Sequence, residues 1–297
     1  MNIKNVTVIG TGVLGTQIAY QIAFCGYKVT VYDVTQKNLD NAKVRFKELG
    51  EIYKKDIAAT NEQVDFAISN ISYSLDLAEA VKDADLTSES IPESLDIKKD
   101  FYTQLSKVAK PDAIFTTNSS TLLPSKMAGS VEKPERFLAL HFANNIWKQN
   151  IGEVMGHAGT DPKIFNAVLD FAKSIRMVPI AIHKEQPGYI VNSLQVPFLN
   201  AAIDLYAGGV ADPETIDKTW MIGLNAVKGP FASIDIIGLT TLYNVTKLRA
   251  ESGDEKAAIA VQVLKDNFID KNKLGIATGE GFYKYPNPRY MDPDFLK

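Results

Sequence analysis

The sequence predicts two domains: an α/β domain built on a doubly wound parallel sheet, followed by an all-helical domain. From Asn5 to about His183, short runs rich in β-branched residues alternate with longer amphipathic runs. This pattern is typical of parallel strands joined by right-handed helical crossovers. After Pro187 and Gly188, nearly every run has helical spacing. A length of 297 residues suits two domains, which we expect at residues 1–186 and 187–297.

The strands of the first domain are expected at VTVIG, KVTVYD, DLTSES, AIFTTN, FLALHF, EVMGHA and MVPIAIH, with helices between them. The helix DPKIFNAVLDFAKSI begins with Asp161 and Pro162, an N-cap followed by proline at the first helical position. The polar region 36–70 predicts one or two exposed helices inserted between strands, which would form a cap or a lid.

Helices of the second domain are expected in the runs GYIVNSLQVPFLNAAIDLYAGG, DPETIDKTWMIGL, ASIDIIGLTTLYNVTKLRA and DEKAAIAVQVLKDNFI. Their apolar faces are extensive. Burial inside one chain and packing against another subunit both explain such faces, and the sequence leaves these two alternatives open.

Charge and cysteine content exclude several classes of partner. The net charge of -3 and a pI near 5.7 provide no general attraction for nucleic acid. The N-terminus lacks the apolar core and cleavage site of a secretory signal, and no run approaches 18 apolar residues, so we expect neither export nor a membrane span. The single cysteine, Cys25, is interpreted as a buried thiol, which fits a cytoplasmic location.

A glycine-rich loop directly follows the first predicted strand and opens the next helix. Its sequence, GTGVLG from position 10, has the spacing G-x-G-x-x-G. In such a loop the first glycine permits a tight turn, the second lets the backbone approach a pyrophosphate, and the third lets helix and strand pack closely. We therefore predict a Rossmann-type domain, with a dinucleotide held by Gly10, Gly12, Val13, Leu14 and Gly15 at a helix N-terminus.

Asp33 ends the second predicted strand, 18 residues after Gly15, close to where an acid accepts hydrogen bonds from the adenosine ribose hydroxyls. A carboxylate there would repel a 2′-phosphate, and no arginine immediately follows Asp33, so NAD is predicted over NADP. The alternative is a glycine-rich turn beside a surface aspartate. No metal site is predicted.

Histidine is the side chain best suited to exchange a proton with an alcohol at neutral pH, because its ordinary pKa lies near 6.5. The chain contains His141, His157 and His183. His141 ends the strand FLALHF, at the edge where ligands bind in open α/β sheets, whereas the other two are interpreted as structural. Glu153 opens the next strand, and its carboxylate can reach His141 if the loop 143–152 folds back, as in other base and orienter pairs.

The chain resembles the L-3-hydroxyacyl-CoA dehydrogenase family over nearly its whole length. The motifs that carry the resemblance occur in the family's order: GTGVLGTQIA, Asp33, IPESLDIK, TTNSS, HFAN, GYIVNSLQVPFLNAA, KGPF, DIIGLTT and TGEGFYKY.

The resemblance implies an NAD-dependent dehydrogenase that moves a hydride between NAD and the 3-hydroxyl or 3-oxo group of an acyl substrate. His141 would be the general base and acid, with Glu153 as its partner and with Ser120 and Asn192 near the substrate oxygen. The nicotinamide-ribose side of the cofactor would be lined by Glu93, Lys98, Asn118 and Asn144. A homodimer formed through the helical domain is also implied.

Several of these residues have structural alternatives. Ser120 follows the strand AIFTTN, so its hydroxyl would emerge near His141, but an ordinary helix N-cap has the same signature. Asn192 could reach across the cleft or be one polar residue at a domain contact. Lys98 could be a solvated helix residue, as most lysines are.

The chain also departs from the family. Asn145, Ile146 and Trp147 follow the HF-x-N motif, where the family usually has a proline. Trp147 could form an aromatic wall for a small acyl chain or anchor the loop. The region 36–70, which in the family forms a helical hairpin that helps to hold coenzyme A, looks short, and its Lys43, Arg45, Lys47, Lys54 and Lys55 are a loose equivalent.

The segments HFANNIW, TNSSTLLPS and DPETIDKTW resemble more closely a bacterial subgroup that includes diketoreductases, which reduce 3-oxo esters and dicarbonyls without CoA. The first hypothesis is therefore an NAD-dependent 3-hydroxyacyl-CoA dehydrogenase, and the second a reductase of free 3-oxo esters or 3-hydroxy acids. A third hypothesis, of another class, is a non-catalytic NAD-binding structural or sensor protein, because a fold alone does not establish activity.

Overall fold

The structure is a computed structural model that describes residues 3–297. It forms two compact units, one that ends at Ile190 and one that begins at Val191. Among the described residues, no helix combines the length and the apolar character that crossing a bilayer requires.

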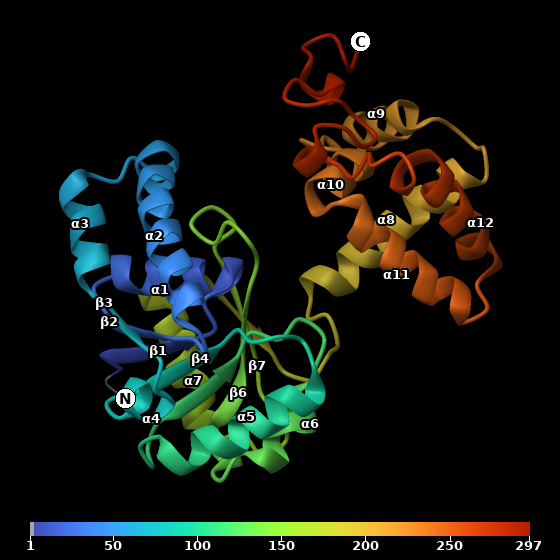
Figure 1. The fold of residues 1–297 in the computed structure, drawn as a ribbon. Helices are drawn as coiled ribbons and strands as arrows, with labels where there is room; N and C mark the ends of the chain where they lie inside the picture. Colours follow the sequence, from blue (N-terminus) through green and yellow to red (C-terminus); the bar gives the residue numbers. More distant parts are fainter. Residues whose placement is uncertain (1–2) are drawn as a thin grey trace. The chain divides into compact units, whose positions relative to one another are not determined.

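The first unit is an eight-stranded sheet with helices on both faces (Figure 1). Its strands are β1 (Asn5–Ile9), β2 (Lys28–Tyr32), β3 (Ile71–Ser74), β4 (Leu86–Glu89), β5 (Ile114–Thr117), β6 (Phe137–Phe142), β7 (Ile151–Met155) and β8 (Val178–Ile182). Its helices are α1 (Val13–Phe24), α2 (Gln36–Ile57), α3 (Asn61–Ser69), α4 (Leu77–Val81), α5 (Leu95–Val108), α6 (Pro124–Met127) and α7 (Pro162–Ser174).

The strand order β3-β2-β1-β4-β5-β6-β7-β8 confirms the predicted doubly wound fold. The chain winds outward from β1 to β3 and then crosses to β4, so the winding reverses between β1 and β4, where such sheets bind ligands. The sheet is mostly parallel, and the exception is the pair β6 and β7, which run in antiparallel directions. Strand β3 was not predicted, since ISYS is only four residues long and half polar.

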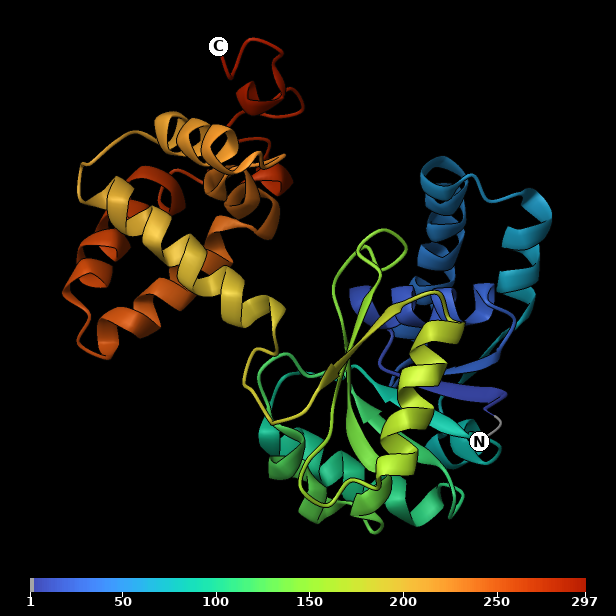
Figure 2. The ribbon, with the colours of Figure 1, turned by 180° about the vertical axis from the view of Figure 1, so that it is seen from behind.

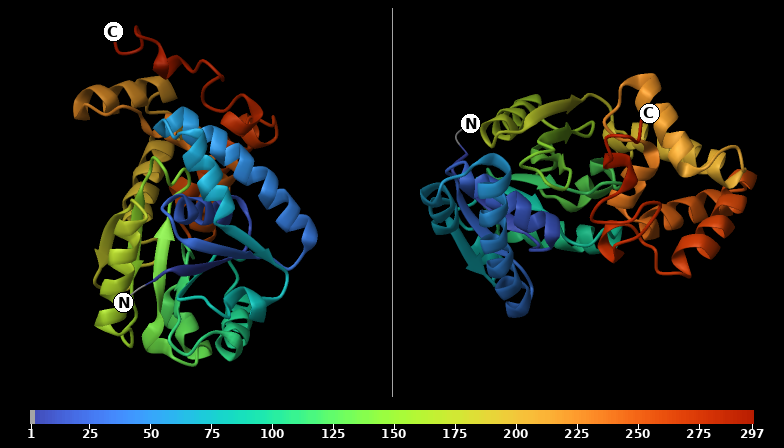
Figure 3. Two further views of the ribbon diagram at one scale, coloured as in Figure 1. Left: turned by 90° about the vertical axis from the view of Figure 1, so that its left-hand side faces the viewer. Right: turned by 90° about the horizontal axis from the view of Figure 1, so that it is seen from above.

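Two apolar cores cover the two faces of the sheet. Helices α1, α2, α3 and α7 pack on one face, and α4, α5 and α6 on the other. Figures 2 and 3 show α7 alongside the sheet. Asp161 caps α7 as predicted, since its side chain accepts a hydrogen bond from the Lys163 N–H. The polar region 36–70 forms the two helices α2 and α3, and their apolar faces belong to the core.

The second unit is helical, as predicted. It contains α8 (Val191–Ala207), α9 (Pro213–Leu224), α10 (Pro230–Ile237), α11 (Leu239–Glu251) and α12 (Glu255–Leu264). The run ASIDIIGLTTLYNVTKLRA, expected as one helix, is split between α10 and α11 by Gly238. Gly238 has a φ of 98°, a conformation that interrupts the helical path and that favours glycine.

Two buried carboxylates attach the C-terminal segment to this unit. Asp235 accepts hydrogen bonds from the N–H groups of Phe282 and Tyr283, and Asp217 accepts one from the Tyr283 hydroxyl. A Cβ at Gly281 would lie 2.2 Å from an Asp235 oxygen, so the approach requires glycine. The TGEGFYKY motif is therefore explained as a structural anchor.

Candidate active site

The glycine loop lies at the carboxyl end of β1 and is closely packed on one side and open on the other. Gly10 has a φ of 89°, and a Cβ there would lie 2.5 Å from the Ser90 carbonyl oxygen. A Cβ on Gly15 would lie 2.0 Å from the Gly10 carbonyl oxygen. At Gly12, in contrast, a Cβ would meet nothing within 4 Å. The open backbone at Gly12, next to the N-terminus of α1, is where a pyrophosphate fits.

A cavity of about 690 Å³ extends from this loop toward β2 and is lined by Gly10, Gly12, Asp33, Asn38, Ile91 and Phe101 among others. Apolar side chains such as Ile91 and Phe101 could contact an adenine ring, and Asp33 lies where it could accept from the ribose hydroxyls.

Asp33 is held by four hydrogen bonds. One oxygen accepts the N–H (2.8 Å) and the hydroxyl (2.7 Å) of Thr11, and the other accepts the Val34 N–H (2.8 Å) and the Asn38 amide (2.7 Å). Burial alone would raise the pKa of this carboxyl, but the hydrogen bonds from Asn38, Thr11 and Val34 outweigh burial and lower it. Asp33 therefore stays charged, as exclusion of a 2′-phosphate requires.

A second cavity, of about 290 Å³, lies on the other side of the glycine loop. It brings together three of the four residues expected around the nicotinamide ribose, namely Glu93, Lys98 and Asn118. Residues 12–15 of the glycine loop and Ser120 also line it. One glycine loop thus borders both an adenosine-sized cavity and a cavity with reactive side chains, which is the arrangement that NAD requires.

Lys98 is buried, so the alternative of a solvated lysine was wrong. Its ammonium lies 2.5 Å from Glu89 and 3.5 Å from Glu93. Glu89, at the end of β4, also accepts hydrogen bonds from the hydroxyls of Thr117 (2.7 Å) and Tyr102 (3.1 Å). A buried lysine needs such partners, because an uncompensated charge in the interior costs several kcal/mol.

Glu93 is fixed by the loop that follows β5. The same carboxylate oxygen accepts the hydroxyls of Ser119 (2.5 Å) and Thr121 (2.8 Å) and the Thr121 N–H (3.0 Å). Burial raises the pKa of Glu93, and these hydrogen bonds, together with the charge of Lys98, lower it overall. The side chain is therefore an ionised acceptor at the edge of the second cavity.

His141 and Glu153 face each other directly across the antiparallel pair β6 and β7. The Nδ1 of His141 lies 2.9 Å from Oε2 of Glu153, and both side chains are buried. With Glu153 as a carboxylate acceptor, Nδ1 is the donor of this bond and Nε2 is the nitrogen that faces Ser120. The Ser120 hydroxyl lies 3.1 Å from this Nε2.

Ser120 therefore contacts the histidine and also lines the second cavity. It is not the N-cap of the next helix, since α6 begins at Pro124 with Leu123 as its N-cap.

The predicted asparagines lie in three different settings. Asn118 accepts the Phe142 N–H at 2.9 Å and fixes the end of β6. Asn144 is exposed in the loop between β6 and β7, outside the linings of the two cavities. Asn192 lies in the first turn of α8, in the second unit.

The two histidines interpreted as structural lie away from the pair of His141 and Glu153. The His157 ring contacts the Pro134 carbonyl oxygen at 2.9 Å and accepts the Gly159 N–H at 3.1 Å. His183 is exposed after β8.

Trp147 is an anchor for the loop that joins β6 to β7. Its indole N–H donates to Asp56 at 2.9 Å, and its ring lies 5.4 Å from that of Tyr53. Lys148 also pairs with Asp56, at 2.9 Å. Of the two alternatives for Trp147, the structure supports attachment to α2.

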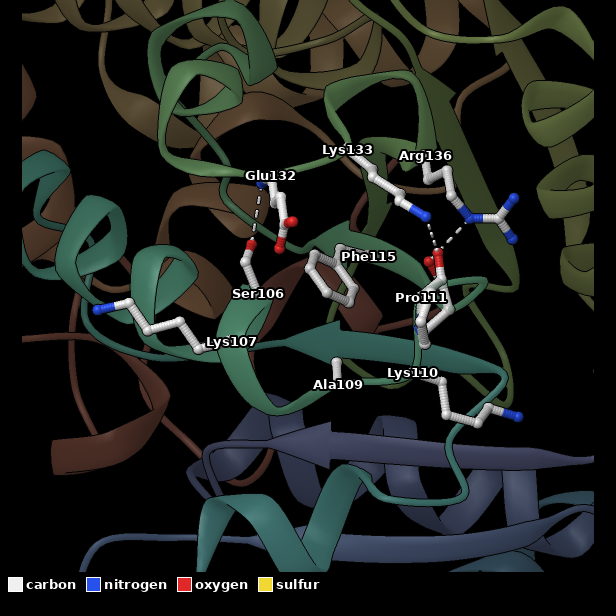
Figure 4. A pocket seen from close by; sticks show the side chains of 10 residues that line it. Ser106, Lys107, Ala109, Lys110, Pro111, Phe115, Glu132, Lys133 and Arg136 are labelled. Atoms are coloured by element: carbon white, nitrogen blue, oxygen red, sulfur yellow. Dashed lines mark hydrogen bonds between the residues drawn. The ribbon is translucent and has the colours of Figure 1, made fainter.

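A further cavity, of about 360 Å³, lies near the amino ends of β5 and β6 (Figure 4). Two of its cations donate to the backbone: Lys133 to the Pro111 carbonyl at 3.1 Å and Arg136 to the Ala113 carbonyl at 3.1 Å. Lys110 pairs with the Asp85 carboxylate at 2.7 Å. These bonds tie two loops together, so we assign this cavity a structural role.

Four residues of the site were not predicted from the sequence: Glu89, Ser119, Thr121 and Tyr189, whose ring stacks on that of His141. Polar residues at the ends of DLTSES and TTNSS were a signal for the first three, because the carboxyl ends of adjacent parallel strands meet at one edge. Tyr189 carried no such signal.

Comparisons with known proteins agree with this geometry. The family model described as 3-hydroxyacyl-CoA dehydrogenase, NAD binding domain, matches residues 5–186, and the model described as its C-terminal domain matches residues 188–285. The human mitochondrial hydroxyacyl-coenzyme A dehydrogenase is 35% identical, over 95% of this chain and 91% of its own length. The 3-hydroxybutyryl-CoA dehydrogenase of Clostridioides difficile is 33% identical, over 94% and 98%.

Among solved structures, a diketoreductase described as acting on dicarbonyl compounds is 53% identical, with a TM-score of 0.92 and coverage of 96% of this chain and 100% of that chain. The fold and the matched domains thus define an NAD-dependent oxidoreductase acting on CH–OH groups. The chain belongs to the 3-hydroxyacyl-CoA dehydrogenase family. Because the matched domains and relatives are those of dehydrogenases, we reject the hypothesis of a non-catalytic NAD-binding protein.

Replacement of Asp33 by serine should weaken the preference for NADH over NADPH. The variant lacks the charge that repels a 2′-phosphate and the acceptors for the ribose, so the KM for NADH should rise by roughly tenfold. Steady-state kinetics with both cofactors measure this, with Asp40→Ser on the exposed face of α2 as the control. An unchanged ratio of the two kcat/KM values in the Asp33 variant would contradict the assignment.

Proposed function

We propose that His141, Glu153, Ser120 and Asn192 carry out the proton transfer that accompanies oxidation of a 3-hydroxyl or reduction of a 3-oxo group. The observation that supports this most is the continuous chain from Glu153 through His141 to Ser120. Ser120, the last member of this chain, lines the cavity of the glycine loop. NAD, when bound, accepts or supplies the hydride.

Each residue of the chain has a distinct task. Nε2 of His141 takes the hydroxyl proton during oxidation and returns a proton to the oxygen during reduction. The charge that then appears on the ring is stabilised by Glu153 through Nδ1. Ser120 donates a hydrogen bond to the same oxygen and keeps it near Nε2. Asn192, at the start of α8, is proposed as the second donor on the basis of the family resemblance.

The proposed substrate is a 3-hydroxyacyl thioester of CoA, as the names of the relatives indicate. Within the candidate CoA region on α2, some cations are already engaged. Lys43 pairs with Asp40 at 2.9 Å, Lys54 pairs with Glu51 at 2.8 Å, and Arg45 donates to the Thr11 carbonyl at 2.8 Å.

These engaged cations, together with the 53% identity to a diketoreductase, favour a second candidate: free 3-oxo esters or dicarbonyl compounds. The chemistry at His141 is the same for both candidates. They differ only in whether binding energy from the CoA handle contributes to kcat/KM.

A homodimer and a cytoplasmic location remain proposals. The helical unit exposes Val227, Leu224 and Leu248, apolar side chains that a second copy of the unit could cover. Cys25 is half-buried, and burial raises the pKa of its thiol to about 11, which fits an unreactive thiol in a reducing compartment.

Replacing His141 with glutamine should lower turnover by about 10²- to 10⁴-fold, because the variant cannot exchange the proton. The affinity for NADH, measured by fluorescence titration, should stay within about twofold. His183→Gln, which alters an exposed histidine, serves as the control. Turnover of the His141 variant close to that of the native protein would remove His141 from this role.

Three substrates that share one 3-oxo group distinguish the two candidates: acetoacetyl-CoA, its N-acetylcysteamine thioester and ethyl acetoacetate. Recognition of CoA should give acetoacetyl-CoA a kcat/KM at least about 10²-fold above that of the truncated thioester, since remote contacts contribute to transition-state binding. Values within a few-fold of each other for all three would overturn the CoA proposal and support the second candidate.

A further inference from the structure

Tyr189 stacks on the imidazole of His141. The two ring centroids are 4.4 Å apart and the planes differ by 15°. The phenol hydroxyl donates to the Ser119 carbonyl oxygen at 2.7 Å, and the side chain is only 1% exposed. The tyrosine is therefore fixed at both its ring and its hydroxyl.

The backbone at this position adopts an unusual conformation. Gly188 has a φ of 78°, and Tyr189 itself has a φ of 55°, in the left-handed region that side chains other than glycine rarely occupy. A residue stays in such a strained conformation only when its surroundings hold it there, and such residues cluster at active sites.

The next residue holds the other member of the pair. The N–H of Ile190 donates to Oε1 of Glu153 at 2.9 Å, while Oε2 of the same carboxylate accepts from His141. Two consecutive residues therefore contact the imidazole and the carboxylate, immediately before the chain enters α8.

The stacked ring restricts a motion that one hydrogen bond leaves possible. The torsion that turns an imidazole about its Cβ–Cγ bond is soft, so the bond from Nδ1 to Glu153 alone would let the ring rock. A ring lying parallel against its face limits this rocking and keeps Nε2 directed at Ser120. The face of a phenol ring also attracts a positive charge, so it favours the protonated imidazole.

We propose that Tyr189 is a positioning residue for proton transfer: its ring holds the imidazole plane of His141, and its hydroxyl ties that ring to the loop that carries Ser120. This inference rests on the proposed role of His141. Tyr189 is not itself the acid, because burial raises the pKa of its phenol far above neutrality and its proton is donated to a carbonyl.

Tyr189→Leu tests the stacking, because leucine keeps the site apolar while it removes the ring. We expect kcat to fall by about 10- to 100-fold, the scale of a small misplacement of a reacting group, with less than about a twofold change in the KM for NADH. In the reductive direction, the pH at which kcat/KM falls to half should move down by about half a unit, because the charged imidazole loses a favourable contact.

Tyr189→Phe keeps the ring and removes the hydroxyl, so it should retain the native pH profile and lose only about two- to fivefold in kcat, the scale of one hydrogen bond. The control is Tyr27→Leu, at a half-buried tyrosine whose ring packs on Phe171 and whose hydroxyl contacts Ser174. This variant should lower the thermal midpoint without moving the pH profile.

If Tyr189→Leu keeps both the pH profile and a kcat within twofold of the native value per folded molecule, the inference is wrong. A loss of activity without a shift of the pH profile, as a purely structural role would give, also overturns it. Measuring His141→Gln in parallel shows whether a failure concerns the proposed function of His141 or only the role of Tyr189. If the His141 variant stays active, the proposed function is wrong. If the His141 variant is inactive while Tyr189→Leu behaves like the native protein, only the inference about Tyr189 is wrong.

Discussion

The antiparallel pairing of β6 with β7 is the constraint on which the site depends. It places His141 directly opposite Glu153, at a distance that lets a carboxylate orient an imidazole without help from a flexible loop. Parallel strands would have needed a helical crossover between these two residues. Because of the reversal, His141 and Glu153 are separated by only twelve positions in the sequence. The connecting loop is anchored to α2 by Trp147.

Near this pair lies a network of charged side chains whose members differ in burial. Glu89 and Lys98 form a buried ion pair at the end of β4, and Glu93 joins it from the edge of the cavity. Such networks contribute little to stability, but they fix the positions of their members. The same loop that holds Glu93 carries Ser119 and Ser120, so the acidic side of the cavity and the hydroxyl beside His141 are parts of one hydrogen-bonded structure.

Periodicity and the glycine spacing were sufficient to predict the fold class, because strands and helices have different repeats and because G-x-G-x-x-G followed a strand and preceded a helix. The antiparallel direction of β7 was not predicted, although the connection from Phe142 to Ile151 is too short for a helical crossover and therefore indicates it. The roles of Trp147 and Tyr189 depend on contacts with α2 and β6, far away in sequence, which no local pattern records. For Lys98 the sequence left a solvated position open as an alternative, and only the structure shows that an acid at the end of β4 makes its burial possible.

The central claim is that Nδ1 of His141 donates to Glu153 and that Nε2 is therefore unprotonated and able to take the substrate proton. Nitrogen-15 NMR of the protein with bound NAD tests this directly, with the His141 signals identified by their loss in His141→Gln. The account predicts a protonated Nδ1 and an unprotonated Nε2, and a changed tautomer balance in Glu153→Gln. A proton on Nε2 in the native protein, or spectra that are indifferent to the glutamate, would contradict it.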